Sequence, residues 1–517
     1  MDGIGFVLGE SSITEFSFAV NPSNVPKFGE YVIAENRECK EVLGIVRNVI
    51  NFNRLLEDPL SFEYALKNVS MSKKLLERNE VIVANAKVLG ILDNGEIVPN
   101  RVPVKPNSVV KLASDEILEK IFKNSEGIEL GNLIVRKNIK VTLDVNQLIL
   151  RHFAILSVTG GGKSNAVCII ANEIVRKFKG TLILIDPHGE YAGFVFEDGK
   201  EFGKNVISAG IRPERLEPWE FCSLVGIDRD ASVQRMHLER IFTTVKREKL
   251  SGREFMRKVL DIVEEWINIQ GEIEYVDSTG AVRTARISRE DLNPLYRVKE
   301  YVATFMQRYE DLLTQRDMLA NLREGYLNIV NLSGFDEEQM RVVVAYLLRN
   351  ILIGRISYVR NKNREYWENA CPVVKKPLLT IFEEAHIFAN KGDVSLWMSR
   401  IAREGRKFGI GFGIVSQRPK RISEDILSQC NTKIVLRIVE PNDQRYVQQA
   451  SEQISEDLLS DIASLGVGEA VVVGSAVKIP TAVKIKRFHG QYGGRDIDVV
   501  SEWRSGSSGI SSLEDLL

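Results

Sequence analysis

Cysteine is scarce in this sequence, and the few cysteines are scattered. Five occur in 517 residues, and no two of them form a CxxC pair. This distribution disfavours a disulfide framework or a zinc knuckle and favours a reducing compartment. Histidine is equally rare, with five residues and no metal-ligand spacing, so we expect structural roles for His188 and His386.

Long hydrophobic runs are also missing. No stretch of the sequence approaches the ~20 uninterrupted apolar residues of a membrane-spanning helix. The first residues, MDGIGFVLGESS, lack the basic and then long apolar layout of a signal peptide. We therefore expect a cytoplasmic protein with no membrane partner.

The sequence has no excess of positive charge. It has 69 lysines and arginines and 70 aspartates and glutamates, which gives a formal net charge of -1. This balance argues against a simple DNA-coating protein, because such a protein needs a broad basic surface. It leaves open an assembly whose basic residues line one channel. The hydrophobic fraction of 44% and the charged fraction of 27% are typical of a soluble globular protein.

The N-terminal part of the chain is rich in short strands. Segments with β-branched residues, separated by Gly, Asn and Pro, fill residues 1–105 and predict a small β-barrel. Within this part, Asp93-Asn94-Gly95 has the composition of a hairpin turn. Residues 106–150 are interpreted as a connecting segment with one helix, ASDEILEKIFKN, and strand-like sequence after it.

From residue 151 onward the pattern changes to apolar strands that alternate with amphipathic helices. This order predicts an α/β fold with a doubly wound, largely parallel sheet. Charged, helix-favouring sequence interrupts the pattern and predicts a helical insertion, and a Gly/Ser-rich tail follows the last strands. The expected parts are a first α/β segment at 151–210, the helical insertion at 211–325, a second α/β segment at 326–488 and the tail at 489–517.

The run SVTGGGKSNAV, residues 157–167, has the second half of a Walker A loop. Backbone N–H groups of such a loop point at a β-phosphate, and the next helix adds a favourable dipole. Lys163 would reach the β- and γ-phosphates of ATP, and the Ser164 hydroxyl would bind Mg²⁺. Ser157 replaces the usual first glycine. The alternative is an accidental glycine turn, which the strand before the loop and the helix after it disfavour. The nucleotide-binding candidates are Gly160, Gly161, Gly162, Lys163, Ser164 and Asn165.

A second motif, LLTIFEEAH at residues 378–386, has the pattern of a Walker B strand. Glu383 would lie beside Mg²⁺, and Glu384 would polarise the attacking water, because hydrolysis needs a proton acceptor in line with the γ-phosphate. The alternative is a pair of solvated glutamates that open a helix. The phosphate loop upstream favours catalysis.

A third stretch, residues 399–419, combines a basic helix with a buried strand. Arg403 and Arg406 are three residues apart on one face of a helix that we expect Asp393 to cap and Gly409 to end. The following strand brings Gln417 to its carboxyl end, where Gln417 would sense the γ-phosphate. Either arginine would neutralise charge in the transition state. The alternative for each arginine is a solvated helix face.

Asp186 ends the strand that follows the phosphate-loop helix. Its carboxylate would help to organise Mg²⁺ or water. Equally, Asp186 is in place to be a turn residue before Pro187, and the sequence leaves both roles open.

Taken together, the motifs identify a family. TGGGKS, IDPHGEY, NIVNLSGFDEEQMR, FEEAH and AREGRKFGIGFGIVSQRP, behind a barrel-like N-terminus, resemble the archaeal HerA family of FtsK-like motor ATPases. The resemblance covers nearly the whole chain. It implies an N-terminal barrel of the kind shared with ATP-synthase subunits, a RecA-like P-loop motor domain, an inserted helical bundle and a C-terminal segment that embraces the next subunit.

The resemblance also implies the activity and the partners. Members of the family are ATP-driven translocases or helicases of double-stranded DNA, and they form homo-hexamers. They work with a NurA-type nuclease on the ends of double-strand breaks during recombinational repair. The implied cofactors are ATP and Mg²⁺.

Individual residues take roles from the same resemblance. It assigns nucleotide binding to the phosphate loop, metal binding and water activation to Glu383 and Glu384, and sensing to Gln417. Arg406, and less directly Arg403, would lie near the nucleotide, and Arg151 would project across the subunit boundary. Sequence-independent contacts to DNA phosphates would come from basic residues in the loops after the Walker B and sensor strands, namely Lys391, Arg418, Lys420 and Arg421. For each of these four, a solvated charge is the alternative.

Two other functions fit the same motor core. One is a traffic ATPase of the conjugation or secretion type, which the missing membrane segment and the N-terminal barrel disfavour. The other is a scaffold that binds nucleotide without hydrolysing it, which Glu384 beside Glu383 disfavours, since a switch has little need of a second carboxylate. ATPase assays with and without duplex DNA separate the three.

Overall fold

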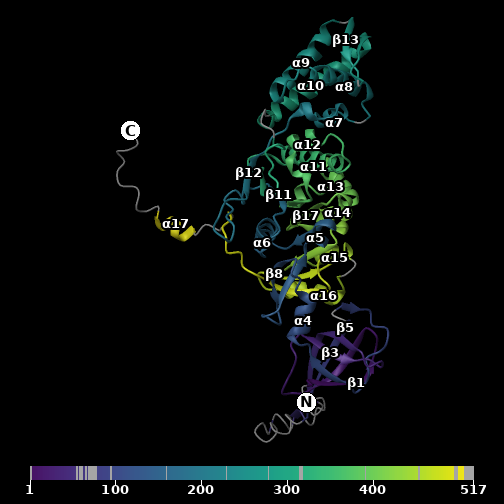
Figure 1. The fold of residues 1–517 in the computed structure, drawn as a ribbon, viewed down its shortest axis with the longest axis vertical. Helices are drawn as coiled ribbons and strands as arrows, with labels where there is room; N and C mark the ends of the chain where they lie inside the picture. The colour runs from purple at the N-terminus through teal and green to yellow at the C-terminus, as the bar shows by residue number, and fades with distance from the viewer. Residues whose placement is uncertain are drawn as a thin grey trace. The chain divides into compact units, whose positions relative to one another are not determined.

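The chain divides into two compact units, and each is described by itself. In the computed structural model (Figure 1), residues 1–173 and 411–487 form the first unit, and residues 174–410 and 488–517 form the second. The structure describes residues 3–53, 79–93, 96–158, 160–228, 230–269, 271–277, 279–313, 318–390, 392–451, 454–493 and 499–505, together with positions 56, 62, 63 and 67.

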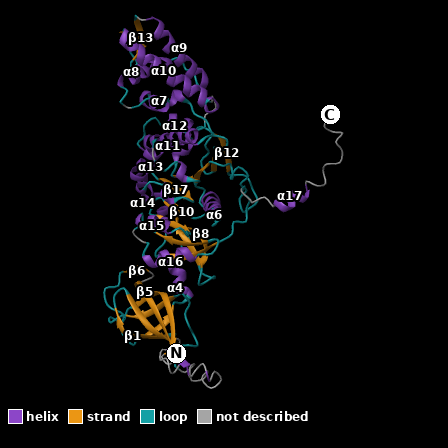
Figure 2. Cartoon of the chain, turned by 180° about the vertical axis from the view of Figure 1, so that it is seen from behind, coloured by secondary structure: helices purple, strands orange, loops and turns teal. Residues whose placement is uncertain are grey.

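The first unit begins with a closed β-barrel. Its strand order is β2-β1-β7-β3-β4-β5-β6, and β2 also pairs with β5, so six strands close on themselves. Alternate residues of these strands are buried and fill the barrel interior, among them Phe16, Phe18 and Val42. Figure 2 shows these strands in orange. The strands are β1 (Gly5–Ser11), β2 (Glu15–Val20), β3 (Tyr31–Glu35), β4 (Glu41–Asn53), β5 (Glu80–Asp93), β6 (Glu96–Val98) and β7 (Val109–Leu112).

The rest of the first unit is a mixed sheet with the order β17-β10-β18-β19-β20-β8-β9. Strand β10 pairs in parallel with both β17 and β18, and the strands beyond β18 are antiparallel. The strands are β8 (Gly127–Leu133), β9 (Lys140–Asp144), β10 (Phe153–Leu156), β17 (Ile410–Ser416), β18 (Thr432–Leu436), β19 (Glu469–Val473) and β20 (Thr481–Ile485). The helices are α4 (Asp115–Phe122), α5 (Val145–Leu150), α6 (Lys163–Arg176, which continues into the second unit), α14 (Glu424–Gln429), α15 (Pro441–Gln449) and α16 (Glu456–Ser464).

Polar contacts tie the barrel to this sheet region. Arg47 of β4 forms an ion pair with Asp461 of α16, with 2.5 Å between Nη1 and Oδ2. The Tyr31 hydroxyl lies 3.0 Å from the Thr481 hydroxyl, and burial raises the pKa of Tyr31 to about 12. These buried pairs fix the barrel on the part of the chain that carries the phosphate loop.

The second unit contains a parallel sheet with the order β12-β15-β11-β16. Its strands are β11 (Thr181–Asp186), β12 (Lys204–Ser208), β15 (Leu327–Asn331) and β16 (Leu378–Phe382). Every residue of β11 and β16 is buried, as expected for central parallel strands. The other elements of this part are α11 (Glu337–Val359), α12 (Arg364–Ala370), α13 (Asp393–Glu404) and α17 (Val499–Ser505).

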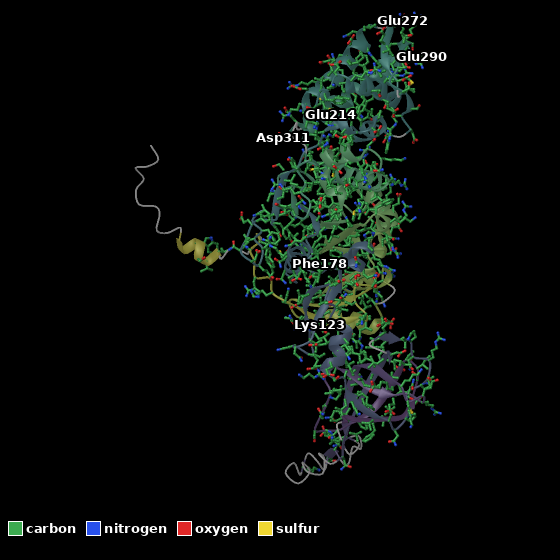
Figure 3. The ribbon with its side chains drawn as sticks, in the orientation of Figure 1. Lys123, Phe178, Glu214, Glu272, Glu290 and Asp311 are labelled. Carbon is green, nitrogen blue, oxygen red and sulfur yellow. The ribbon has the colours of Figure 1, made fainter. Side chains whose placement is uncertain are left out.

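Four helices and one hairpin form the insertion in the second unit. The helices are α7 (Pro218–Leu224), α8 (Ser232–Lys246), α9 (Gly252–Ile269) and α10 (Arg289–Arg308), and the hairpin is β13 (Glu272–Val276) with β14 (Val282–Arg286). Figure 3 labels two exposed glutamates of this insertion, Glu272 and Glu290. Apolar faces pack inward, with Phe242 of α8, Phe255 of α9 and Val298 of α10 fully buried.

The structure confirms the predicted α/β class with an N-terminal barrel and an inserted helical region, and it shifts several boundaries. The barrel continues past residue 105 through β7, and the expected connecting segment contributes β8 and β9 to a sheet. Asp93 pairs with Glu96, so a hairpin flanks positions 94 and 95, which lie outside the described residues. Strand β12 and the β13–β14 hairpin were not expected. Helix α6 ends at Arg176.

Helix α11 is a long apolar helix of the second unit. Met340, Val343, Val344, Leu347 and Ile351 are all buried. Within the described residues, α11 is long and apolar enough to cross a membrane by length and composition, and 61% of its apolar window is buried inside the protein. Burial of this kind is the property of a core helix.

Candidate functional site

The glycine-rich run forms a turn between β10 and α6, as the sequence predicts. Strand β10 is buried throughout, and α6 begins at Lys163, directly after the last glycine. Gly160 and Gly162 have φ values of 75° and 103°, which non-glycine residues rarely adopt. The loop therefore needs glycine at these two positions, and its end coincides with a helix N-terminus, where anions are stabilised.

Ser157, the departure from the Walker A pattern, lies against Gly161. It is 1% exposed, and its hydroxyl donates a hydrogen bond of 2.9 Å to the Val158 carbonyl oxygen. A Cβ atom on Gly161 would lie 1.9 Å from the Ser157 Oγ. The Ser157 side chain thus occupies the space that a side chain at position 161 would need. Because residue 161 is glycine, the loop accommodates serine in place of the usual first glycine.

Gln417 lies at the same sheet edge as the loop. Ser416, the last residue of β17, pairs with Leu156 of β10, and its carbonyl oxygen accepts a hydrogen bond of 3.3 Å from the Ser157 N–H. The residue after each strand is therefore at the carboxyl edge, with Gln417 beside the start of the loop. This is the position expected of a residue that senses bound nucleotide.

The first turn of α6 carries the remaining loop candidates. Lys163 is 8% exposed, and Ser164 follows it in the same turn. Asn165 donates a side-chain hydrogen bond of 2.9 Å to the Lys486 carbonyl oxygen, and the Lys486 ammonium pairs with Glu173 at 3.1 Å. In this structure Asn165 therefore holds the helix to the end of β20.

The acidic motif lies in the second unit, at the carboxyl end of β16. Glu383 is 7% exposed. Glu384 has a φ of 44°, a left-handed conformation that is uncommon for glutamate and that clusters at functional sites. A 3-10 turn (Ala385–Ile387) follows rather than an α-helix. The alternative of two solvated glutamates opening a helix does not describe this geometry.

His386 lies beside the second glutamate. Its Nδ1 is 3.2 Å from the Glu384 Oε2, and both side chains are largely buried, with 17% and 12% exposed. The sequence analysis gave His386 a structural role. The structure places its imidazole beside the carboxylate expected to activate water, and the structural role stays a prediction.

Asp186 is a turn residue, the second of its two expected roles. Its carboxylate accepts hydrogen bonds from the N–H groups of Gly189, Glu190 and Tyr191 at 2.9, 3.1 and 2.8 Å. Burial raises the pKa of Asp186 above its usual value, and these backbone hydrogen bonds offset only part of that effect. The hydroxyl of Tyr191 in turn donates a hydrogen bond to Glu383 Oε1. The sequence analysis missed Tyr191, although it ends the IDPHGEY motif.

The three candidate arginines lie at the amino ends of strands. Arg151 is exposed and ends α5, just before β10, so β10 separates it from the phosphate loop of the same chain. Arg403 and Arg406 are exposed and precede β17. Helix α13 ends at Glu404, and Arg406 belongs to a 3-10 turn (Gly405–Lys407), so the expectation of one helix to Gly409 is wrong. Asp393 is the first helical residue rather than the cap, which is Gly392.

The basic candidates for DNA contact differ in their surroundings. Arg418, Lys420 and Arg421 are exposed around a 3-10 turn (Pro419–Arg421) that follows β17. Lys420 is 3.4 Å from Glu440, so its charge is partly balanced. Lys391 lies outside the described residues.

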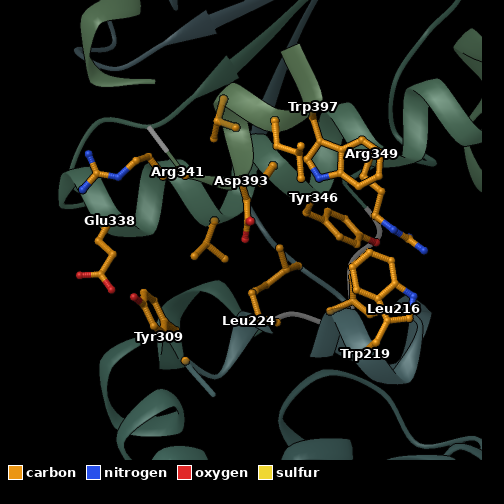
Figure 4. Close-up of a pocket in the computed structure, with 17 residues that line it drawn as sticks. Leu216, Trp219, Leu224, Tyr309, Glu338, Arg341, Tyr346, Arg349, Asp393 and Trp397 are labelled. Carbon is orange, nitrogen blue, oxygen red and sulfur yellow. The ribbon is translucent and has the colours of Figure 1, made fainter. Parts of the chain in front are cut away.

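The second unit also contains a cavity of about 270 Å³. It lies between the insertion and helices α11 and α13, and no residue of the Walker motifs lines it. Figure 4 shows Trp219, Tyr346 and Trp397 on one side of this cavity and Glu338 and Arg341 on the other. The cavity is therefore distinct from the predicted nucleotide-binding residues.

The donor groups present fit ATP with Mg²⁺. Across the described ranges, no three His, Cys, Asp or Glu side chains converge to hold a metal ion. That excludes an all-protein metal cage there, whereas Mg²⁺ typically takes one or two protein oxygens and completes its shell with phosphates and water. The Ser164 hydroxyl in the first unit and the Glu383 carboxylate in the second unit are each a hard oxygen donor of that kind.

Comparisons with known proteins show which family the chain belongs to. Three family models match it: "HAS barrel domain" at residues 4–94, "Helicase HerA, central domain" at 128–351 and "Helicase HerA-like C-terminal" at 370–489. The "DNA double-strand break repair helicase HerA" of Pyrococcus furiosus is 41% identical over 97% of this chain and 96% of its own length. A "Probable DNA double-strand break repair helicase HerA" of Methanocaldococcus jannaschii is 41% identical over 96% and 98%. The HerA helicase of Saccharolobus solfataricus is 34% identical over 97% and 95%. The chain therefore belongs to the HerA family of helicases.

Proposed function

We propose that this protein is an ATP-driven motor that translocates along and unwinds double-stranded DNA during double-strand-break repair. The observation that carries the proposal is the acidic motif: a buried strand ends in Glu383, and Glu384 is turned into a left-handed conformation directly after it. A phosphate loop of suitable geometry precedes it in the chain. Family membership over nearly the full length supports the same activity.

The residues divide the work of hydrolysis. The N–H groups of the glycine loop and the Lys163 ammonium would bind the phosphates, while the Ser164 hydroxyl and the Glu383 carboxylate would hold Mg²⁺. The chemistry that Mg²⁺ would supply there is neutralisation of the charge that develops on the phosphates. Glu384 would accept a proton from the attacking water, and the His386 Nδ1 lies 3.2 Å from Glu384 Oε2. Gln417, at the edge of the loop, senses whether the γ-phosphate is present.

Hydrolysis is shared between neighbouring subunits of a ring. Arg151 is exposed and lies at the other end of β10 from its own phosphate loop, so it is suited to complete the site of a neighbour. Arg406 and Arg403 are exposed in the same way and are the other candidates for an arginine finger, whose charge stabilises the transition state. We infer a homo-hexamer in which movement between subunits follows each hydrolysis step.

The ring encloses the DNA. Exposed Arg418 and Arg421 after β17, together with Lys420, supply contacts to backbone phosphates, which are independent of base sequence and sensitive to salt. A few basic residues repeated around a ring suffice for a chain with a net charge of -1. The motor works with a NurA-type nuclease in resection of the broken ends, and we infer that the N-terminal barrel is the surface that meets it.

The test is the ATPase rate of the purified protein with and without linear duplex DNA. We expect duplex DNA to accelerate hydrolysis and Lys163→Ala to abolish it under both conditions. A rate that is equally slow with and without DNA would indicate a nucleotide-switched scaffold instead. Electron microscopy of particles with nucleotide and duplex would show the ring, and full-speed hydrolysis by a monomer would contradict the shared site.

A further inference from the structure

Tyr191 reaches the Walker B carboxylate from the neighbouring strand. Strands β11 and β16 pair in parallel, with Ile185 opposite Phe382. Asp186 is the last residue of β11, Glu383 follows β16, and Tyr191 lies in the turn that Asp186 organises. The Tyr191 side chain is 1% exposed, and its hydroxyl donates a hydrogen bond to Glu383 Oε1.

A hydrogen bond from a phenol has a specific effect on a buried carboxylate. It engages one carboxylate oxygen as the acceptor and restricts rotation of the carboxylate group. The other carboxylate oxygen therefore keeps a fixed direction. Bonds to an ionised acceptor are also stronger than bonds between neutral groups. Glu383 is 7% exposed, which limits competition from water for the same oxygen. Partners of this kind orient the groups that bind a metal.

The turn that carries Tyr191 is held from two sides. From inside, the Asp186 carboxylate accepts the N–H groups of residues 189 to 191. From outside, the segment of residues 488–493 pairs with the turn and the residues after it. The Gly493 N–H donates a hydrogen bond of 2.7 Å to the Glu190 carbonyl oxygen, and Val195 and Gln491 exchange two backbone hydrogen bonds of 2.7 and 3.0 Å.

Side chains reinforce this outer support. Phe194 stacks on Phe488 with 5.3 Å between ring centroids. The approach at Gly493 is so close that a Cβ atom there would lie 2.4 Å from the Glu190 carbonyl oxygen. The chain continues from Gly493 toward α17, so residues 488–493 connect the C-terminal part of the protein to the turn that holds Glu383.

We propose that Tyr191 is a positioning residue for Glu383 and that residues 488–493 set the position of Tyr191. This inference rests on the proposed function, because it assigns Glu383 to Mg²⁺. In this proposal Tyr191 acts through Glu383, whose Oε1 accepts the hydrogen bond from the Tyr191 hydroxyl. Displacement of residues 488–493 would move Glu383 through Tyr191, so a contact made by the C-terminal part of the chain would alter how the site holds Mg²⁺.

The first test is Tyr191→Phe in the full-length protein, which removes the hydroxyl and keeps the ring. The probe is a fluorescent ATP analogue titrated at increasing Mg²⁺ concentration, with ATPase measured in parallel. We expect the Mg²⁺ concentration for half-maximal binding to rise about tenfold, the lower end of the usual effect for such partners, with binding in EDTA unchanged. An unchanged Mg²⁺ requirement would overturn the proposal.

A matched control exists in the same unit. The Tyr358 hydroxyl donates a hydrogen bond of 3.2 Å to Glu368 Oε1, so Tyr358→Phe removes the same chemistry elsewhere, and we expect wild-type Mg²⁺ dependence. In a Glu383→Gln background, Tyr191→Phe should produce little further shift, because residues that act through one group are not additive. A full additional shift there would mean that Tyr191 acts by another route.

The second test addresses residues 488–493. Gly493→Ala places a Cβ against the Glu190 carbonyl, and we expect the same rise in Mg²⁺ requirement as for Tyr191→Phe. Gly193→Ala in the same turn is the control, because a Cβ there meets nothing within 4 Å. Equal Mg²⁺ dependence of the two glycine variants would overturn this part. If the wild-type protein shows DNA-stimulated ATPase activity and neither Tyr191→Phe nor Gly493→Ala changes the Mg²⁺ requirement, this inference fails while the proposed function stands.

Discussion

The Ser157 hydroxyl and Gly161 fill one space in the phosphate loop. A Cβ on Gly161 would lie 1.9 Å from the Ser157 Oγ and 3.3 Å from its Cβ. The backbone of Gly161 is outside the left-handed region, so a side chain there is limited by its neighbours, the Ser157 side chain and the Val158 carbonyl oxygen at 3.2 Å from the added Cβ. A side chain at position 161 is therefore expected to be tolerated only when residue 157 is made smaller.

We expect Gly161→Ala to weaken ATP binding about tenfold or more, since overpacking costs ~1–3 kcal/mol. Ser157→Gly in the same chain should restore most of the affinity, and Ser157→Gly alone should bind as wild type does. Fluorescence titration with an ATP analogue measures all three. The complementarity would be disproved by a double variant that binds no better than Gly161→Ala.

Lys163 and Glu384 should separate binding from hydrolysis. Lys163→Ala removes the cation that meets the phosphates, so we expect loss of nucleotide binding. Glu384→Gln removes the proton acceptor and keeps the shape, so we expect ATP to bind while turnover falls by a factor of about 10² to 10⁴. Equilibrium binding and single-turnover hydrolysis distinguish the two. Wild-type turnover in Glu384→Gln would remove Glu384 as the water activator.

Arg151 should act in trans. Alone, Arg151→Ala is expected to lower turnover, because the charge that develops in the transition state of the neighbouring site loses its cationic partner. Arginine fingers raise kcat by about 10³- to 10⁵-fold. When Arg151→Ala subunits are mixed with Lys163→Ala subunits, part of the ATPase activity should return. An interface between the two variants can pair the intact phosphate loop of the first with the intact Arg151 of the second. ATPase assays across mixing ratios provide the measurement, with each variant alone as control. Absence of any recovery would leave Arg151 a structural residue.

The cysteines should differ sharply in reactivity. Cys39 is exposed and the other four are buried, and burial raises the pKa of Cys222 and of Cys430 to about 12. Because the thiolate is the reactive form, these two thiols remain protonated and unreactive near pH 8. We expect one fast-reacting thiol per native chain with a coloured disulfide reagent and five after denaturation. Loss of the fast phase in Cys39→Ser is the control, and several fast thiols in that variant would contradict the burial.

Sequence reasoning worked best where a motif is local. The phosphate loop lies between adjacent elements, and the Walker B pair follows its strand directly, so strand, turn and helix patterns within some twenty residues were enough to place them. It failed where a contact joins distant segments. The Tyr191 hydroxyl and Glu383 are 192 residues apart, and no periodicity links a tyrosine in one turn to a carboxylate in another.

Element boundaries show the same division. Helix α13 was expected to reach Gly409, because its residues favour helix. Gly405 lies so close to the Ile410 carbonyl oxygen that a Cβ would come within 2.5 Å, and the chain tightens into a 3-10 turn there. The β13–β14 hairpin was missed because most residues of β14 are exposed and give no alternating apolar pattern.

By itself the sequence determined the α/β class, the barrel, the phosphate loop and the acidic pair, because each depends on residues that are neighbours in the chain or follow one period. Tertiary structure decided the turn role of Asp186, the imidazole of His386 on Glu384 and the support that residues 488–493 give to the Tyr191 turn. These contacts arise when strands from separate parts of the chain pair in one sheet, and strand order is fixed by packing rather than by local sequence.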